Sequence, residues 1–200
     1  MARKTPTDDR PLAVRPATPD DWPAVELLLG RDGERGCWCQ YWRLSASDYS
    51  ARPLGEGARL MRRQLADEPA PGIVAYRGDE PAGWLGLWPR QRFERLNRSR
   101  TIPQVDDVAV WSIVCFYIRV GYRRQGVARG LLEGAIDYAR RCGAPALEAY
   151  PIDPAGQRAD VAFGYVGFLP MFERAGFRAI TETAARSDGR PRILVRRDLR

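Results

Sequence analysis

The most constraining feature of this sequence is an uncharged run of β-branched and aromatic residues from Val108 to Ile118. Alternate residues of a strand point to opposite faces, and here both sets are largely apolar. One set consists of Val108, Val110, Ser112, Val114, Phe116 and Ile118, and the other of Ala109, Trp111, Ile113, Cys115 and Tyr117. Because a strand that is apolar on both faces is buried on both sides, the run predicts a central strand of a sheet.

A short loop rich in glycine and arginine follows this run and leads into a segment with helical periodicity. The loop reads Gly121-Tyr122-Arg123-Arg124-Gln125-Gly126. The apolar residues that follow at helical spacing are Ala128, Leu131, Leu132, Ala135, Ile136 and Ala139. Arg140 and Arg141 suit the negative end of a helix dipole, and Gly143 can adopt the left-handed conformation that often ends a helix. The sequence therefore predicts a strand, a loop and a helix in succession.

The start of such a helix can bind phosphate groups, because its first backbone N–H groups have no partner within the helix. Gly126 would let the backbone approach a ligand closely, and Arg123 and Arg124 add positive charge. Gly126, Gly130 and Gly134 fall on one edge of the helix, where each interior glycine costs about 1 kcal/mol relative to alanine. Close packing on the sheet, or a ligand, would offset that cost. An ordinary connection between strand and helix would show the same pattern.

The spacing within the loop adds a family resemblance. Arg123-x-x-Gly126-x-Ala128 matches the (Arg/Gln)-x-x-Gly-x-(Gly/Ala) signature of GNAT-type N-acetyltransferases, and the chain resembles that superfamily. Neither a Gly-x-Gly-x-x-Gly nor a Gly-Lys-(Ser/Thr) motif occurs, which argues against dinucleotide and P-loop sites. The resemblance implies that the pyrophosphate of acetyl-CoA is held by Arg123, Arg124, Gln125, Gly126, Val127 and Ala128. It also implies that the backbone of Phe116 and Ile118 pairs with the pantetheine arm.

Length and charge restrict the class of protein. Two hundred residues suit one domain, which we expect to span 11–200 after a flexible N-terminal segment, 1–10. The net charge of +7, from 32 basic and 25 acidic residues, fits a polyanionic ligand such as CoA. It also fits nucleic acid. However, the arginines are spread along the chain and no nucleic-acid-binding signature occurs, so we do not expect nucleic acid to be the main partner.

Histidine is absent, which removes the commonest general base and the commonest metal ligand. The four cysteines are Cys37, Cys39, Cys115 and Cys142. Cys37-x-Cys39 has no second pair at zinc-ligand spacing, so we expect no metal. A disulfide between Cys37 and Cys39 would be strained, and a redox role for them stays open. Without a signal peptide or an apolar run of membrane length, the sequence predicts a cytoplasmic protein with reduced thiols and no membrane partner.

The other segments complete an α/β fold with a mixed sheet. Leu12 to Arg15 predicts a strand, and Thr18-Pro19-Asp20-Asp21-Trp22 has the residues of a helix start. The remaining expected elements are a helix over 57–67, a hairpin joining 73–76 to 82–88, a strand over 146–150 parallel to the central one, a helix over 168–174 and a hairpin joining 178–183 to 192–197. The five arginines from Arg90 to Arg100 predict a solvated surface. The GNAT resemblance implies about seven strands flanked by helices.

The segment from Cys37 to Trp42 is unusual, because it places three aromatic residues and two thiols within six positions. In GNAT enzymes the region between the first two helices helps to wall the acceptor site. The resemblance therefore implies that Trp38, Tyr41 and Trp42 line an acceptor pocket. The same residues could instead fill an edge of the core beneath a loop, and the sequence does not decide between the two.

Acetyl transfer requires that the amine lose a proton, that the thioester carbonyl be polarised and that the departing thiolate be stabilised. In many GNAT enzymes a tyrosine on the last helix protonates the thiolate. The run from Met171 to Phe177 resembles the signature around that tyrosine but has Phe172 in its place, which has no proton to give. We therefore expect Tyr150 as the acid and Glu148 as the base, although Glu148 could simply pair with an arginine. Other candidates are Tyr165, Cys115 and Tyr117.

Three functions remain open from the sequence. The preferred one is an N-acetyltransferase that moves an acetyl group from acetyl-CoA to a primary amine, on a small molecule or a protein, by direct attack in a ternary complex. The same fold could bind acyl-CoA as a regulator without turnover, which the missing tyrosine allows. The charge allows a nucleic-acid-binding module. Homodimers are common in the resembling family, so a homodimer is also an expectation.

Overall fold

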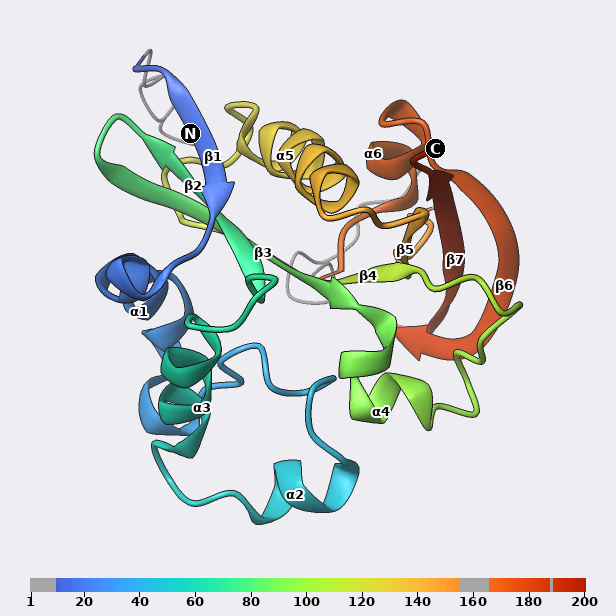
Figure 1. Ribbon diagram of the computed structural model, residues 1–200, viewed down its shortest axis with the longest axis horizontal. Coiled ribbons are helices and arrows are strands. Elements are labelled where there is room, and N and C mark those ends of the chain that lie inside the picture. The colour runs from blue at the N-terminus through green and yellow to red at the C-terminus, as the bar shows by residue number, and fades with distance from the viewer. Residues whose placement is uncertain (1–9, 155–165, 188) are drawn as a thin grey trace.

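The computed structural model describes residues 10–154, 166–187 and 189–200. A seven-stranded mixed sheet runs through it in the order β1-β2-β3-β4-β5-β7-β6 (Figure 1). Its strands are β1 (Leu12–Pro16), β2 (Gly72–Arg77), β3 (Glu80–Pro89), β4 (Trp111–Ile118), β5 (Ala146–Ala149), β6 (Arg178–Ser187) and β7 (Arg190–Asp198). The predicted mixed sheet is confirmed, and β4 lies at its centre. The expected flexible segment, 1–10, falls almost entirely outside the described residues.

Helices cover both faces of the sheet. They are α1 (Trp22–Leu29), α2 (Ala46–Ala51), α3 (Glu56–Gln64), α4 (Glu94–Asn97), α5 (Val127–Arg141) and α6 (Leu169–Arg174), with 3-10 turns at Pro19–Asp21, Gly30–Arg35 and Arg90–Arg92. On one face α5 packs against β1, β2 and β3, and α6 packs against β6 and β7. On the other face α1 packs against β3 and β4, with α3 beside it (Figure 1). In the described part of the chain, no helix combines the length and the apolar character needed to cross a membrane.

The central strand differs from its prediction in two respects. It begins at Trp111 rather than Val108, because the preceding residues form a tight turn in which the Val110 N–H donates to the Val108 carbonyl at 2.8 Å. In addition, its pairing with β3 shifts between Gly86 and Leu87, which face Cys115 and Ile113. Val114 is thus an extra residue, a β-bulge that reverses the alternation of faces.

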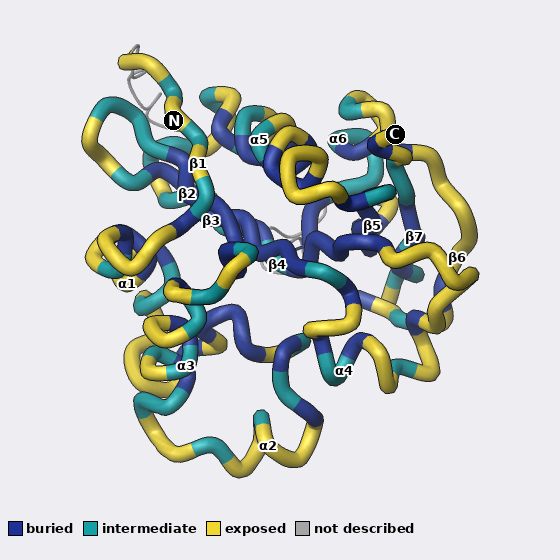
Figure 2. The backbone as a smooth tube through the Cα atoms, viewed as in Figure 1, coloured by how far each residue is buried: buried dark blue, intermediate teal, exposed yellow. Residues whose placement is uncertain are grey.

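The bulge places side chains together that the sequence pattern assigns to opposite faces. Ile113 and Phe116 both join the core beneath α5 and α6, whereas Cys115 and Tyr117 pack toward α1 and α3. The prediction that side chains alternate between the two faces without interruption from Val108 to Ile118 is therefore wrong beyond Val114. Figure 2 shows the central strands β3, β4 and β5 largely buried, whereas β6 at the edge is largely exposed.

Strands β4 and β5 pair along only part of their length. Trp111–Ile113 lies parallel to Leu147–Ala149, and β5 then ends. Beyond Ile113, that edge of β4 has no strand partner among the described residues. The Arg119 N–H donates to Ala82 of β3 at 3.0 Å, and backbone groups alternate along a strand. The polar backbone groups of Ile118, and of Phe116 two residues earlier, therefore face the open edge.

Two glycines of α5 let this helix lie close to the first strand. A Cβ atom on Gly130 would lie 2.4 Å from the Leu12 side chain, and one on Gly134 would lie 2.5 Å from the Val14 side chain. Such distances are far shorter than any contact between non-bonded carbon atoms. Close packing on the sheet thus explains these two helix-interior glycines, which leaves Gly126 as the glycine available to a ligand.

Candidate active site

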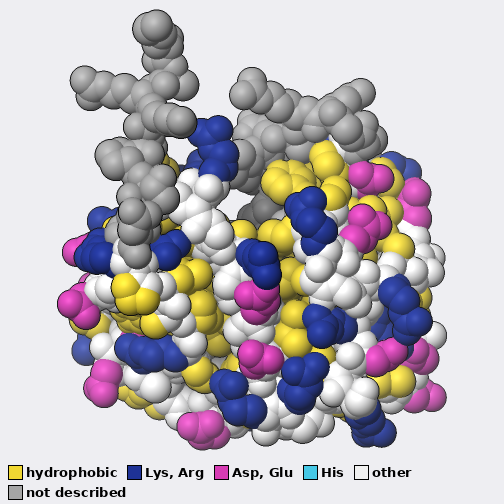
Figure 3. Space-filling model, turned by 90° about the horizontal axis from the view of Figure 1, so that it is seen from above, with side chains coloured by type: hydrophobic (Ala, Val, Ile, Leu, Met, Phe, Trp, Pro, Cys, Tyr) yellow, Lys and Arg dark blue, Asp and Glu magenta, His cyan; other side chains and the backbone are white. Residues whose placement is uncertain are grey.

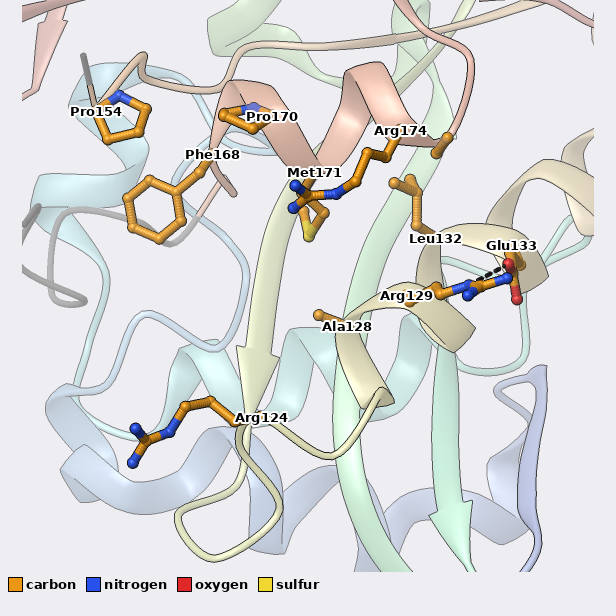
Figure 4. A pocket seen from close by; sticks show the side chains of 11 residues that line it. Arg124, Ala128, Arg129, Leu132, Glu133, Pro154, Phe168, Pro170, Met171 and Arg174 are labelled. Carbon is orange, nitrogen blue, oxygen red and sulfur yellow. Dashed lines mark hydrogen bonds and ion pairs between the residues drawn. The ribbon is translucent and has the colours of Figure 1, made fainter. Parts of the chain in front are cut away.

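A groove of about 950 Å³ lies between the first turns of α5 and helix α6. Ala128 and Leu132 line it from α5, and Met171 and Arg174 line it from α6. Figure 4 shows Met171 and Arg174 directed from α6 toward the α5 side of the groove, with Phe168 at the start of α6. The groove combines apolar walls with cationic side chains, which suits a long ligand that has both apolar and phosphorylated parts.

The start of α5 presents unpaired backbone donors to this region. Gly126 occupies the N-cap position with φ of +82°, and the first helical hydrogen bond runs from the Gly130 N–H to the Gly126 carbonyl at 2.9 Å. The N–H groups of Val127, Ala128 and Arg129 therefore have no acceptor within the helix. Among the described residues, no atom lies within 4 Å of the position that a Gly126 Cβ would take. The geometry fits a pyrophosphate held by backbone amides.

The other predicted loop residues divide into two groups. Arg124 is exposed and lines the groove, whereas the Arg123 side chain reaches back to the Ile118 carbonyl at 3.4 Å. The Gln125 side chain donates to the Gly121 carbonyl at 2.6 Å, which closes the loop on itself. Val127 is buried in the core, so only its backbone can face a ligand. The structure thus brings Arg124 and Ala128 to the groove, Gly126 begins the helix beside them, and the remaining residues shape the loop.

A second cavity, of about 390 Å³, lies on the opposite side of the sheet, beside α1 and the segment that follows it. Its lining includes Phe116, whose ring also meets Phe172 of α6, with ring centroids 6.0 Å apart. Phe116 therefore contacts the second cavity and the helix that lines the groove. Phe116 thus links the wall of the second cavity to α6, the helix that borders the groove.

Two of the three aromatic residues predicted for an acceptor pocket line this second cavity. Trp38 is only 5% exposed, stacks on Trp22 with centroids 5.7 Å apart, and donates from Nε1 to the Gly33 carbonyl at 3.0 Å. Tyr41 is 37% exposed and lines the cavity. Trp42 is absent from the lining and packs edge-on against Tyr41 at 5.0 Å, in contact with the core. Trp42 thus supports the cavity wall from behind.

Glu148 and Tyr150, the predicted base and acid, lie in a buried polar cluster. The Glu148 carboxylate accepts from Arg196 at 2.6 and 3.0 Å and is 3.6 Å from Arg90. The Tyr150 hydroxyl accepts from Arg90 at 2.5 Å, donates to Glu148 at 3.2 Å and is 2.9 Å from the Ser112 hydroxyl. Burial, followed by the Glu148 charge, raises the pKa of Tyr150. Neither residue lines the groove or the second cavity.

This cluster corrects one sequence prediction and bears on another. Arg90 was expected on a solvated surface but is only 5% exposed and also donates to the Ile102 carbonyl at 2.9 Å. The prediction is wrong for Arg90, because acceptors that are distant in the sequence surround it. The sequence also allowed Glu148 simply to pair with an arginine, and its carboxylate does pair with Arg90 and Arg196. Tyr165, another candidate, lies outside the described residues.

Sequence reasoning missed several residues that line the second cavity. Tyr49 comes from α2 and Leu28 from α1, whereas Tyr117, at the end of β4, was already a candidate for the acid. Cys39 was noted only for its spacing from Cys37, although Arg43, four residues later, lies buried beside it. The spacing of Cys39 and Arg43 is the local signal that could have indicated a perturbed thiol. All four cysteines, each within the described ranges, are free thiols.

Charged side chains on the face above α5 are mixed rather than gathered by sign. Figure 3 shows Lys and Arg side chains interspersed with Asp and Glu and with apolar residues. On α5 itself, Arg129 pairs with Glu133 at 2.8 Å, and Arg140 pairs with Asp137 at 3.3 Å. A face of this kind lacks the continuous basic surface that binds a nucleic-acid backbone.

Comparisons with known proteins agree with this geometry. The family model described as "Acetyltransferase (GNAT) family" matches residues 38–177. No curated protein matches the sequence significantly. Among solved structures, a GNAT-family acetyltransferase from Streptococcus pneumoniae has a TM-score of 0.55 and 19% identity, covering 94% of this chain and 99% of that one. A GCN5-related N-acetyltransferase from Kribbella flavida has a TM-score of 0.56 and 21% identity, covering 94% and 98%.

A third similar structure, yncA from Salmonella typhimurium, was solved with its cofactor acetyl-CoA. It has a TM-score of 0.55 and 14% identity, and the match covers 94% of each chain. At these identities the structural matches establish the fold, whereas the family model spans well over half of the sequence. The protein therefore belongs to the acetyltransferase (GNAT) family, whose members use acetyl-CoA.

Proposed function

We propose that the protein transfers an acetyl group from acetyl-CoA to a primary amine by direct attack within a ternary complex. The observation that carries this proposal is the position of Phe116, which lines the second cavity while its ring contacts Phe172 of α6, the helix that borders the groove. One site can hold acetyl-CoA while the other holds the acceptor. The amine could then reach the thioester without an intermediate in which the enzyme itself carries the acetyl group.

The cofactor side of the proposal rests on the start of α5 and the open edge of β4. The unpaired N–H groups at Val127 and Ala128 would hold the pyrophosphate, with Arg124 supplying charge. The backbone groups of Phe116 and Ile118 that face the open edge would pair with the amides of the pantetheine arm. The thioester carbonyl would then lie near the bulge, where a backbone N–H can polarise it.

Glu148 and Tyr150 stay candidates for the base and the acid. Their favourable feature is the contact of Tyr150 with Ser112, which joins the pair to β4. Their ion pairs and hydrogen bonds with Arg90 and Arg196 are the feature that weighs against them, because both oxygens of the Glu148 carboxylate already have partners within the protein. The rates of Glu148→Gln and Tyr150→Phe as a function of pH test both roles.

The acceptor is proposed to be a small amine or a protein amine, and one domain over 11–200 is proposed to carry both sites. Calorimetry with acetyl-CoA tests the cofactor site. Release of CoA thiol in the presence of a panel of polyamines, aromatic amines, amino acids and peptides with free N-termini tests the transfer. We expect heat with acetyl-CoA and thiol release with at least one amine. Absence of heat would contradict the cofactor site.

The alternative function, an acyl-CoA-binding regulator without turnover, is supported by Phe172, which cannot donate a proton. Tight binding of acetyl-CoA with no thiol release by any amine would favour it. A homodimer and a cytoplasmic location remain proposals, and sedimentation of the purified protein would test the first.

A further inference from the structure

Two thiols from distant parts of the chain meet at the wall of the second cavity. Cys39 follows α1 and its 3-10 turn, and Cys115 lies on β4 directly after the bulged Val114. Both line the cavity; Cys39 is 6% exposed and Cys115 is half-buried. The two side chains are neighbours, since both pack against the backbone of Gly86 on β3. A sulfur pair thus faces the cavity close to Phe116, where the acetyl group is proposed to arrive.

The backbone around Cys39 is shaped to bring its sulfur onto the sheet. Trp38 and Cys39 both adopt left-handed φ values, +48° and +59°, which non-glycine residues seldom do. A Cβ atom on Gly86 of β3 would lie 2.6 Å from the Cys39 Sγ and 3.3 Å from the Cys115 Cβ. The sulfur therefore rests directly on the backbone of β3, in a position that only a glycine at 86 allows.

Buried N–H groups surround this sulfur without other acceptors. Trp84 Nε1 and Arg43 Nη1 form no hydrogen bond of ordinary geometry among the described residues, yet both side chains lie near enough to the Cys39 sulfur to lower its pKa. Arg43 is held in place, since its Nε donates to the Cys39 carbonyl at 3.0 Å and its Nη2 to the Pro71 carbonyl at 2.7 Å. Unsatisfied buried donors are costly, and a thiolate is a better acceptor for them than a thiol.

The two thiols are pushed toward opposite protonation states. The neighbouring Cys115 thiol is the largest influence on the pKa of Cys39 and lowers it. Burial raises this pKa and the Arg43 charge lowers it, so that the pKa of Cys39 falls to about 6. The contact with Cys39, followed by burial and by the negative charge of Cys39, raises the pKa of Cys115. These opposite shifts, together with the buried donors of Arg43 and Trp84, favour the thiolate form of Cys39 and the thiol form of Cys115.

We propose that Cys39 is the general base and Cys115 the general acid of the acetyl transfer, and that they replace the tyrosine absent at Phe172. This inference rests on the proposed acetyl transfer. A neutral amine enters the second cavity, and its nitrogen forms a bond to the thioester carbon. The proton that the nitrogen must lose passes to the Cys39 thiolate.

The second half of the reaction returns the pair to its starting state. The bond between the carbonyl carbon and the CoA sulfur breaks, and the sulfur leaves with the electron pair. That sulfur takes the proton of Cys115, and the proton on Cys39 then passes to the neighbouring Cys115 thiolate. The pair accepts one proton and gives one, so the step needs no oxidant, reductant or added base.

Other titratable and charged groups face the cavity from each element around it. Besides Arg43, these are Arg31, Asp32, Cys37, Tyr41, Tyr49 and Tyr117. The Asp32 and Arg31 side chains are 66% and 65% exposed and pair with each other at 3.5 Å. Cys37 contributes a further raising influence on the pKa of Cys115. None of these groups adds a positive charge as close to Cys39 as Arg43.

The first experiment measures the thiolate directly, without any acceptor. The ultraviolet absorbance of thiolates is followed against pH, in reducing buffer, for the wild type, Cys39→Ser and Cys115→Ala. The matched control is Cys142→Ser, an exposed thiol at the far end of α5. We expect a thiolate that forms near pH 6 in the wild type and the control, is missing in Cys39→Ser, and forms at higher pH in Cys115→Ala. A thiolate that forms at the same pH in Cys115→Ala would overturn the coupling of the pair.

The second experiment measures turnover with an amine that the wild type acetylates. General base catalysis contributes about 10²- to 10⁴-fold, so we expect kcat of Cys39→Ser to fall by at least about 100-fold with an unchanged Kd for acetyl-CoA. The turnover rate of the wild type should fall as the pH drops below about 6. In Cys115→Ala the same fall should begin at a higher pH. If Cys39→Ser fails to fold, the shift in Cys115→Ala still decides the proposal.

Three outcomes would overturn the assignment. Turnover by Cys39→Ser at the wild-type rate would show that Cys39 is not the base. A rate that falls at the same acid pH in Cys115→Ala as in the wild type would show that Cys115 does not affect the protonation of Cys39. An acetyl group found on Cys39 by rapid quench and mass spectrometry would make this residue a nucleophile instead. A wild type that binds acetyl-CoA but acetylates no amine would contradict the proposed function itself, a result distinct from turnover that persists without Cys39.

Discussion

The ring of Phe172 on α6 meets the ring of Phe116 on β4 edge to face, with centroids 6.0 Å apart. Phe177 contacts Phe172 in the same manner at 5.2 Å, and Phe172 has no exposed surface. An apolar cluster thus occupies the place where the family resemblance leads one to expect a tyrosine. This arrangement is stable because it buries three rings at favourable angles.

Phe172→Tyr tests whether that place lacks a proton donor. The new hydroxyl would be buried among aromatic rings, and an unsatisfied buried hydroxyl costs about 1–3 kcal/mol. We expect a lower stability to urea and no gain in kcat, because the thiol pair already supplies the proton. A rise in kcat of about 100-fold would show that the wild type lacks an acid.

Gly126→Ala tests the pyrophosphate site and has a matched control in Gly143→Ala. Both glycines have positive φ, +82° and +75°, and neither added Cβ would meet a described atom within 4 Å. Each substitution should therefore cost about 1 kcal/mol of stability through backbone strain. Only Gly126→Ala should weaken the binding of acetyl-CoA measured by calorimetry. We expect a Kd about tenfold higher, which corresponds to about 1.4 kcal/mol. Equal affinities in the two variants would contradict a phosphate site at the start of α5.

Glu148→Gln separates a structural role from a catalytic one. Removing one partner of a buried ion pair typically costs about 3–5 kcal/mol, because Arg90 and Arg196 would keep uncompensated charge. The control is Glu133→Gln, whose exposed pair with Arg129 at 2.8 Å should contribute at most about 1 kcal/mol. We expect a large loss in urea denaturation and, on the folded fraction, a retained kcat. A folded variant without activity would support Glu148 as the base.

The lowered pKa of Asp21 predicts that the protein loses stability at acid pH. Burial alone would raise its pKa, but hydrogen bonds from Tyr76, from the Thr18 backbone and from Arg15 together hold the pKa below its usual value. Since the folded pKa is the lower one, this stabilisation is complete above the unfolded pKa of about 3.9 and is lost as the pH falls through the folded value. We expect urea stability to fall below about pH 4, less steeply in Asp21→Asn.

The same substitution has an expected cost at neutral pH. Asp21→Asn removes the charge that accepts two hydrogen bonds from Arg15, at 2.6 and 2.7 Å, and one from Tyr76 at 2.5 Å. Hydrogen bonds to charged groups contribute about 1.5–3 kcal/mol, so we expect a loss of roughly 2 kcal/mol at pH 7. An unchanged stability at pH 7 would mean that the Arg15 and Tyr76 contacts contribute nothing.

Much of the scaffold could be read from local pattern. The uncharged run predicts β4, the helical spacing predicts α5, and Gly143 with φ of +75° ends that helix as expected. Thr18 and Asp21 form the capping box of the first helical turn. These features depend on residues within a few positions of each other, so their physical causes are visible along the sequence.

What the sequence by itself determined is the strand, the glycine–arginine loop and the helix that form the proposed cofactor side, because periodicity and loop spacing act locally. The tertiary structure alone decided the bulge at Val114, the burial of Arg90 and the meeting of Cys39 with Cys115. In each case the deciding contact joins segments far apart in the chain. Whether a carboxylate, guanidinium or thiol can act chemically depends on its neighbours in space, which only the packed fold brings together.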